Sequence, residues 1–209
     1  MDARNDNQRR AYWLKTLHQW HWISSALCLL GMLLFSVTGI TLNHASQIEG
    51  NPQVTTRTGT LDDAARGALA VVPDAPDAPL PPAVRRWVAD ALSVELPAGA
   101  AVEWSPEEAY VALPRPGGDA WLRIDRGTGD AEYERTDRGW ISYFNDLHKG
   151  RHTGTAWSWF IDLFAVAALL FSITGLFILK LHAANRPTTW PIVGLGVVIP
   201  VVLALLFIH

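Results

Sequence analysis

Residues 22–43 read WISSALCLLGMLLFSVTGITLN, an apolar stretch without a charged side chain. A helix needs about 20 apolar residues to cross the hydrocarbon core of a bilayer, with a working range of about 17–25. Two later stretches, Trp157–Leu181 and Pro191–Ile208, meet the same requirement. The sequence therefore predicts a membrane α-helical protein with three transmembrane helices, at residues 22–43, 156–181 and 191–208. The first stretch is longer than the apolar region of a signal peptide, about 7–15 residues, so we expect it to be retained.

The composition excludes several other classes of protein. Hydrophobic residues make up 49% of the 209 residues and charged residues 18%, which is too apolar for a disordered chain. The single cysteine, Cys28, excludes an internal disulfide framework, a cysteine-based zinc site and a cysteine-ligated iron–sulfur cluster. A net charge of −3 gives no reason to expect a nucleic-acid partner, whereas membrane lipid is expected as one.

Basic residues in the short flanks of the spans predict the orientation of the chain. The tail, residues 1–21, carries four of them, and the loop at residues 182–190 carries Arg186. Because the tail and this loop must lie on the same side of the membrane, we expect both to be cytoplasmic. Residues 44–155 are then extracytoplasmic.

The segment at residues 44–155 is predicted to be an inserted α+β domain with linkers. Residues 46–60 are interpreted as a linker. Apolar residues at helical spacing predict helices over residues 61–72 and 82–92. The period then changes to two, which predicts short strands over residues 101–104, 109–113, 120–124 and 131–135.

Two of the predicted spans share a seven-residue repeat. Residues 33–39 read LLFSVTG and residues 169–175 read LLFSITG, and a histidine, His44 or His182, follows each copy. Small residues at this spacing allow membrane helices to pack closely. All seven histidines fall at the predicted membrane boundaries: His18, His21 and His182 on the cytoplasmic side, and His44, His148, His152 and His209 on the outer side.

Imidazole is the commonest protein ligand for transition metals, so these histidines are candidate ligands. His18 and His21 are three residues apart, and His148 and His152 would also share a helix face if that stretch is helical. The absence of nearby cysteine argues against a typical zinc site, although Asp146 is close to His148 in the sequence. Copper held by the outer histidine cluster remains an alternative.

Haem held by one histidine from each of two helices is the other interpretation, with Gly39 and Gly175 leaving room for the macrocycle. The inner haem would use His182 with His21 or His18, and the outer haem would use His44 with His148 or His152. His21 and His44 are 23 residues apart, about 35 Å along a helix, so two haems would fit, one near each membrane face. The iron ligands expected first are His21, His44, His148 and His182.

The sequence resembles a known family at these histidines. Leu17-His18-Gln19-Trp20 before a span containing Thr38-Gly39 is similar to the first helix of PepSY-associated transmembrane proteins. Leu147-His148-Lys149-Gly150 before a span containing Thr174-Gly175 is similar to their second. The α+β segment occupies the position of the PepSY domain, and the chain looks like a small, three-span member.

The resemblance implies a function, because the family includes inner-membrane reductases of ferric siderophores that carry b-type haem. It implies a bacterial inner-membrane protein with a periplasmic domain, two haem b groups, and electron transfer to a periplasmic iron complex such as a ferric siderophore. The chain would be a haem-dependent ferric reductase or a subunit of one. It has no glycine-rich dinucleotide fingerprint, so the electron donor would be quinol or a separate reductase.

Two other functions remain open from the sequence. One is a non-catalytic, membrane-anchored PepSY module that binds a partner protein, and the other is a copper-handling membrane protein. Asp162, about one turn inside the second span, is either a functional carboxylate or one that reaches water at the interface. The role of His209 and the oligomeric state are left open.

Overall fold

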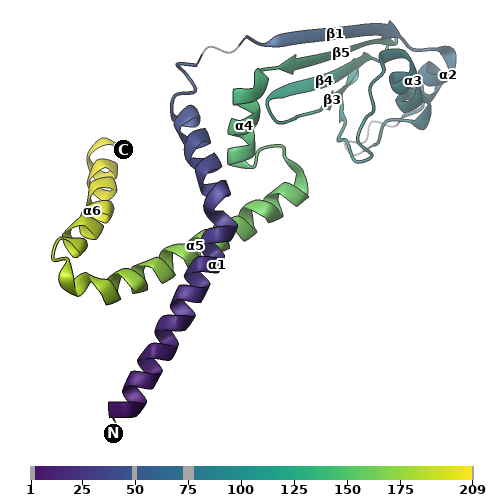
Figure 1. Cartoon of the computed structure of the whole chain (residues 1–209). Helices are drawn as coiled ribbons and strands as arrows, with labels where there is room; N and C mark the ends of the chain where they lie inside the picture. The colour runs from purple at the N-terminus through teal and green to yellow at the C-terminus, as the bar shows by residue number, and fades with distance from the viewer. Residues whose placement is uncertain (1–2, 49–50, 73–77, 209) are drawn as a thin grey trace. The chain divides into compact units, whose positions relative to one another are not determined.

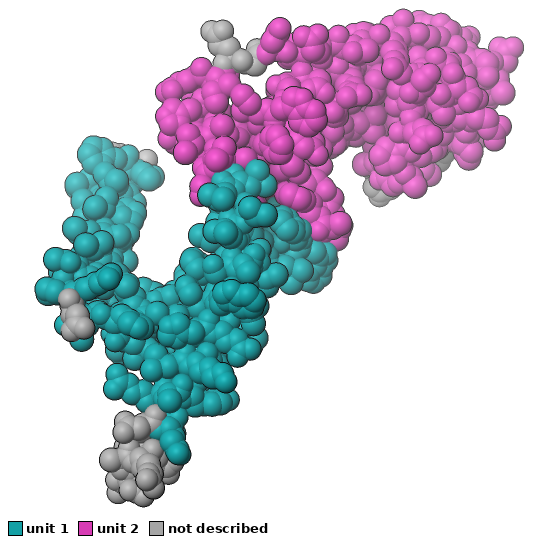
Figure 2. Space-filling view, in the orientation of Figure 1, with its two compact units in different colours: residues 1–34, 159–209 teal, residues 35–158 magenta. Residues whose placement is uncertain are grey.

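The computed structural model describes residues 3–48, 51–72 and 78–208, whose helices and strands are labelled in Figure 1. The chain forms two units, coloured separately in Figure 2. Unit 1 consists of residues 1–34 and 159–209, and unit 2 consists of residues 35–158.

Three long helices confirm the predicted spans. They are α1 (Ala3–Asn43), α5 (Gly154–His182) and α6 (Thr189–Phe207), and a short 3₁₀ helix, η1 (Ala183–Asn185), follows α5. The segments apolar enough to cross a membrane are Gln8–Asn43, Gly154–His182 and Thr189–Phe207. Helix α1 also includes most of the predicted tail, because this segment contains good helix formers and no proline or glycine.

In unit 1, helices α1 and α5 approach closely at Gly31. A Cβ at this position would collide with the ring of Phe164, so only glycine allows this distance between the helices. Cys28, one turn earlier on α1, is fully buried, which agrees with a packing role. Most other apolar side chains of α5 and α6 are exposed, as expected for helices whose surroundings are lipid.

Unit 2 contains an antiparallel five-stranded sheet in the order β1-β5-β4-β3-β2. The strands are β1 (Gln53–Thr60), β2 (Glu103–Trp104), β3 (Glu108–Ala112), β4 (Gly118–Asp125) and β5 (Asp130–Asp137). Helices α2 (Asp63–Ala70) and α3 (Pro82–Leu92) cover one face of the sheet (Figure 1). The expected α+β domain is therefore confirmed.

The core of unit 2 lies between these helices and the sheet. Val84 and Val88, one turn apart on α3, are fully buried, as are Leu122 and Ile124 of β4. Helix α2 begins at the N-cap Asp62, whose carboxylate accepts the Ala65 N–H at 2.8 Å. The apolar side chains that alternate along β4 thus pack against those that recur at helical spacing along α3, in one hydrophobic layer.

Two elements differ from the sequence-based expectation. Residues 53–60 were expected in a linker but form β1, an edge strand that pairs with β5 in the described sheet. Helix α4 (Gly139–Lys149) packs against the β4 side of the sheet, and it ends at Gly150, whose φ is 65°. Glycine adopts this left-handed conformation without the steric cost of a Cβ, which makes it a common helix terminator.

Candidate functional site

In unit 1, His21 of α1 lies against the Thr174-Gly175 motif of α5. Its Nδ1 is 3.1 Å from the Thr174 hydroxyl oxygen and 3.2 Å from the Phe171 carbonyl oxygen. Its ring stacks on Phe171, with ring centres 4.7 Å apart and planes 16° from parallel. A Cβ at Gly175 would be 3.3 Å from His21 Cε1, so glycine leaves the space that the imidazole occupies.

In unit 2, His148 of α4 lies against the Thr38-Gly39 motif of α1 in the same way. Its Nδ1 is 2.7 Å from the Thr38 hydroxyl oxygen. Its ring centre is 4.9 Å from that of Phe35, and a Cβ at Gly39 would be 3.7 Å from its Cε1. The phenylalanine, threonine and glycine of each repeat copy therefore hold one histidine ring from another helix.

The hydrogen bonds define which nitrogen of each ring carries the proton. A carbonyl oxygen only accepts, so His21 Nδ1 donates to Phe171. Donation of the Thr38 hydroxyl proton to the Phe35 carbonyl oxygen, 3.2 Å away, leaves the Thr38 oxygen to accept the proton on His148 Nδ1. Both neutral rings then keep the lone pair on Nε2, the nitrogen that a metal would bind.

His18 and His182 face one another in unit 1. Their ring centres are 6.2 Å apart and their planes are 83° from parallel. Nδ1 of His18 donates to the Leu14 carbonyl oxygen, and Nδ1 of His182 donates to the Ile178 carbonyl oxygen, each at 2.8 Å. Of the two pairings left open by the sequence, the ring contact is the one between His18 and His182.

The outer histidines are arranged differently. His44 Nδ1 donates to the Ile40 carbonyl oxygen of its own helix at 2.9 Å, and its side chain is exposed. Within the described residues, His44 makes no ring contact with His148. His152 lies beyond the end of α4 and has a φ of 57°, so the helical face proposed for His148 and His152 does not form. His209 is outside the described residues.

Two buried polar residues hold α4, the helix that carries His148. Asp146 is 4% exposed, and its carboxylate accepts the Gly117 N–H at 2.9 Å and pairs with Arg151 at 3.1 Å. Asn145 accepts a hydrogen bond from the Thr41 hydroxyl at 2.8 Å. Sequence reasoning noted Asp146 only as a neighbour of His148. The role of Asp146 could not be predicted from the sequence, because it depends on the position of Gly117 in the β3–β4 turn.

Three further features concern the other candidates. Within the described residues, no three histidine, cysteine or carboxylate side chains converge to hold a metal ion. Asp162 is exposed on α5. A cavity of about 610 Å³ lies in unit 2 between the end of α1 and the start of α4, where Ala45, Ile48 and Trp140 contribute to its lining. This volume is within the usual range of small-molecule sites, about 300–1,000 Å³.

Comparison with known proteins identifies the family. The family model described as PepSY_TM-like matches residues 12–209, which is most of the chain and includes every histidine discussed above. No curated protein and no solved structure matches the chain. The resemblance stated from the sequence is therefore confirmed at the level of the family. With three long apolar helices and an inserted α+β domain, this chain belongs to the PepSY_TM-like family of membrane proteins.

Proposed function

We propose that the protein transfers electrons across the bacterial inner membrane and binds two haem b groups for this purpose. Bound haem would supply a one-electron carrier whose iron is ligated by imidazole. The observation that carries the proposal is the pair of facing rings, His18 and His182. Histidine side chains from α1, α4 and α5 would ligate the haem iron.

The His18–His182 pair fits an iron ligated from both sides. Two imidazoles on opposite sides of one iron have ring centres about 6 Å apart, because each metal–nitrogen bond is about 2 Å long and the ring centre lies about 1 Å farther. The observed separation is 6.2 Å. Both side chains are exposed, so protein atoms do not enclose the space around the pair.

The hydrogen bonds of these rings also suit a ligand role. Metal-bound histidines almost always donate their second N–H to a carbonyl or carboxylate, which fixes the ring and raises its basicity. His18 and His182 donate from Nδ1 to helix carbonyl oxygens. His21, held by Thr174 one turn along α1 from His18, is in the proposal a positioning residue or an alternative partner of His182.

For the second haem we propose His148 and His44 as ligands. His148 has its Nδ1 bonded to Thr38 and so presents Nε2, as His21 does in unit 1. The two rings do not face one another in this structure, so a shared iron requires one of them to change rotamer. The proposal therefore assigns the outer ligands but no arrangement around the iron.

The remaining parts of the proposal concern partners and orientation. The basic tail and loop support a cytoplasmic N-terminus and a periplasmic unit 2 domain. We propose quinol or a separate reductase as the electron donor, and a periplasmic iron complex such as a ferric siderophore as the acceptor. The copper-handling alternative is not carried forward, because no group of three or more histidine, cysteine or carboxylate side chains converges among the described residues to favour it over haem.

Absorption spectroscopy of the full chain, purified in detergent from haem-replete cells, tests the proposal. We expect a Soret band that shifts on reduction with dithionite, and two haems per chain. His18→Ala and His182→Ala should each remove about half of the haem, and His44→Ala should remove the other half. Gln19→Ala, which changes an exposed neighbour of His18 on α1, is the matched control and should keep both haems.

Three outcomes would contradict the proposal in different ways. A colourless preparation would refute haem binding and favour the membrane-anchored partner-binding module. Complete loss of haem from both His44→Ala and His182→Ala would indicate a single shared site. Full haem content in His182→Ala would refute the assignment of the inner ligands.

A further inference from the structure

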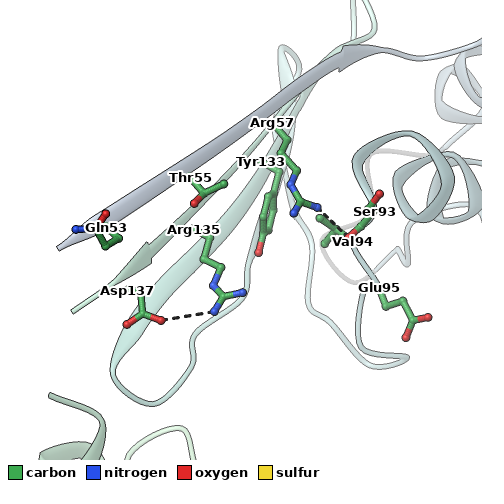
Figure 3. A pocket seen from close by; sticks show the side chains of 9 residues that line it. All are labelled: Gln53, Thr55, Arg57, Ser93, Val94, Glu95, Tyr133, Arg135 and Asp137. Carbon is green, nitrogen blue, oxygen red and sulfur yellow. Dashed lines mark hydrogen bonds and ion pairs between the residues drawn. The ribbon is translucent and has the colours of Figure 1, made fainter. Parts of the chain in front are cut away.

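The sheet of unit 2 has a groove on its core face, beyond the C-terminal end of α3. Its volume is about 340 Å³. Arg57 of β1 pairs in register with Tyr133 of β5, and Arg135 and Asp137 follow at alternate positions on the same strand. Alternate residues of a strand point to the same face, so these four side chains line one wall of the groove. Figure 3 shows the Tyr133 phenol between the guanidinium groups of Arg57 and Arg135.

The groove is lined by two arginines and two carboxylates, and the third arginine, Arg115, lies beside it at Asp137. Asp137 is paired with Arg135 at 3.5 Å and also with Arg115 at 3.3 Å, so one carboxylate faces two guanidinium groups. The Gly139 N–H, together with Arg115 and Arg135, holds the pKa of Asp137 below its usual range. Arg57 donates to two neutral acceptors, the carbonyl oxygens of Leu92 at 2.6 Å and Ser93 at 3.0 Å.

One buried hydrogen-bond donor beside the groove has no acceptor among the described residues. Arg115 Nη1 is buried, and no described atom accepts a hydrogen bond from it. Arg115 lines a second cavity, of about 350 Å³, that meets the groove at Asp137. Tyr133, which is 9% exposed, lines the groove beside these arginines. Buried donors without partners are rare in folded proteins and often mark the position of a missing ligand or water.

We propose that this groove binds a small organic anion with two carboxylate groups. Guanidinium pairs with carboxylate through two parallel hydrogen bonds, and arginine is favoured where such planar recognition is needed. Arg57 and Arg135 occupy diagonal positions on neighbouring strands, about 7–8 Å apart at the backbone. A short dicarboxylate offers one carboxylate to each guanidinium group, with the Tyr133 hydroxyl donating between them.

The volume supports a small ligand. About 340 Å³ is at the lower end of the range for small-molecule sites, which suits a metabolite rather than a macromolecule. Glu95 lies on the wall opposite the strands (Figure 3), so a second acidic group of the ligand is directed toward the arginine side by repulsion. The site lies within unit 2 and does not depend on whether the protein binds haem.

Calorimetric titration of the full chain in detergent with succinate, at constant ionic strength, tests the proposal. We expect saturable binding for the wild type and at least tenfold weaker binding for Arg135→Gln, since a lost charge-assisted pair costs about this much. The matched control is Arg123→Gln. Arg123 also lies on the sheet, but at an alternate position of β4 on the opposite face, where it pairs with Glu108 at 3.5 Å.

A second variant separates ligand binding from folding. Tyr133→Phe keeps the buried ring and removes only the hydroxyl, so it should fold as the wild type does and bind succinate several-fold more weakly. Acetate, with one carboxylate, should bind at least tenfold more weakly than succinate. The proposal is overturned by the absence of saturable succinate binding, by equal losses in Arg135→Gln and Arg123→Gln, or by acetate binding as tight as that of succinate.

Discussion

Replacing the threonine of each repeat copy by valine should destabilise the protein unequally. Thr38→Val removes the one acceptor that the described structure provides for His148 Nδ1. Thr174→Val removes one of two, because His21 Nδ1 also donates to the Phe171 carbonyl oxygen at 3.2 Å. Both substitutions keep the side-chain shape, and both remove a hydroxyl that donates to a carbonyl of its own helix. The difference between their losses of unfolding free energy therefore measures the cost of leaving the His148 N–H without an acceptor.

The magnitude follows from the cost of an unpaired donor. A buried donor left without a partner costs about 1–3 kcal/mol, and side-chain hydrogen bonds in membrane proteins average about 0.6 kcal/mol with a maximum near 1.7. His148 is half-buried, so we expect a loss of about 1.5 kcal/mol for Thr38→Val. The retained Phe171 contact limits the loss for Thr174→Val to about 0.5 kcal/mol.

Equilibrium unfolding in mixed micelles, followed by far-ultraviolet circular dichroism as the fraction of denaturing detergent rises, measures both losses. Ser36→Ala is the matched control, because Ser36 belongs to the first repeat copy and is exposed. Its effect should stay within about 0.5 kcal/mol. Equal losses for the two threonine variants, or no loss for Thr38→Val, would refute the role of threonine in holding the histidines.

Two further predictions concern the domain of unit 2. Gly118→Ala places a Cβ against the Thr136 carbonyl oxygen on the neighbouring strand, so the free energy of unfolding from thermal melts should fall by more than about 2 kcal/mol. Gly67→Ala adds a Cβ in open space within α2 and should raise the free energy of unfolding by about 0.5–1 kcal/mol. The N–H groups of Thr128 and Gly127 lower the pKa of Asp125. The stabilisation that this carboxylate contributes should therefore be present above pH 3.8 and lost as the pH falls below it, and Asp125→Asn should flatten that dependence in acid-titration melts.

The elements that the sequence predicted well are those whose side-chain pattern alone determines them. The range predicted for α3 matches the structure, because Pro82 suits the first turn and the buried valines recur at helical spacing. The three spans follow from length and lack of charge. Strand β1 was missed because six of its eight residues are threonine, glycine or arginine and almost all of its side chains are exposed. An edge strand of this kind shows no alternation of apolar residues.

The candidate site shows a similar division. The repeat and the positions of the histidines were visible in the sequence. The space at Gly39 and Gly175 was predicted for a haem macrocycle, whereas the structure places the imidazole rings of His148 and His21 there. The threonine contacts were not predicted, because the shared Thr-Gly was interpreted as a packing motif rather than as an acceptor. The pairing of His18 with His182 depends on the facing of two helices, which spacing along one chain does not determine. Likewise, the separation of His152 from α4 depends on the left-handed Gly150.

The pairing of β1 with β5 has a consequence for biogenesis. Strand β1 leaves the ribosome soon after α1, yet its partner in the described sheet, β5, is the last strand of the sheet to be made. The nascent chain must therefore wait with β1 unpaired while the meander from β2 to β5 is synthesised. Gln53 pairs with Asp137, directly before α4, so this late closure draws α4 toward the end of α1. His148 can meet Thr38 only after that step, which makes the contact between α4 and the end of α1 a late event in folding.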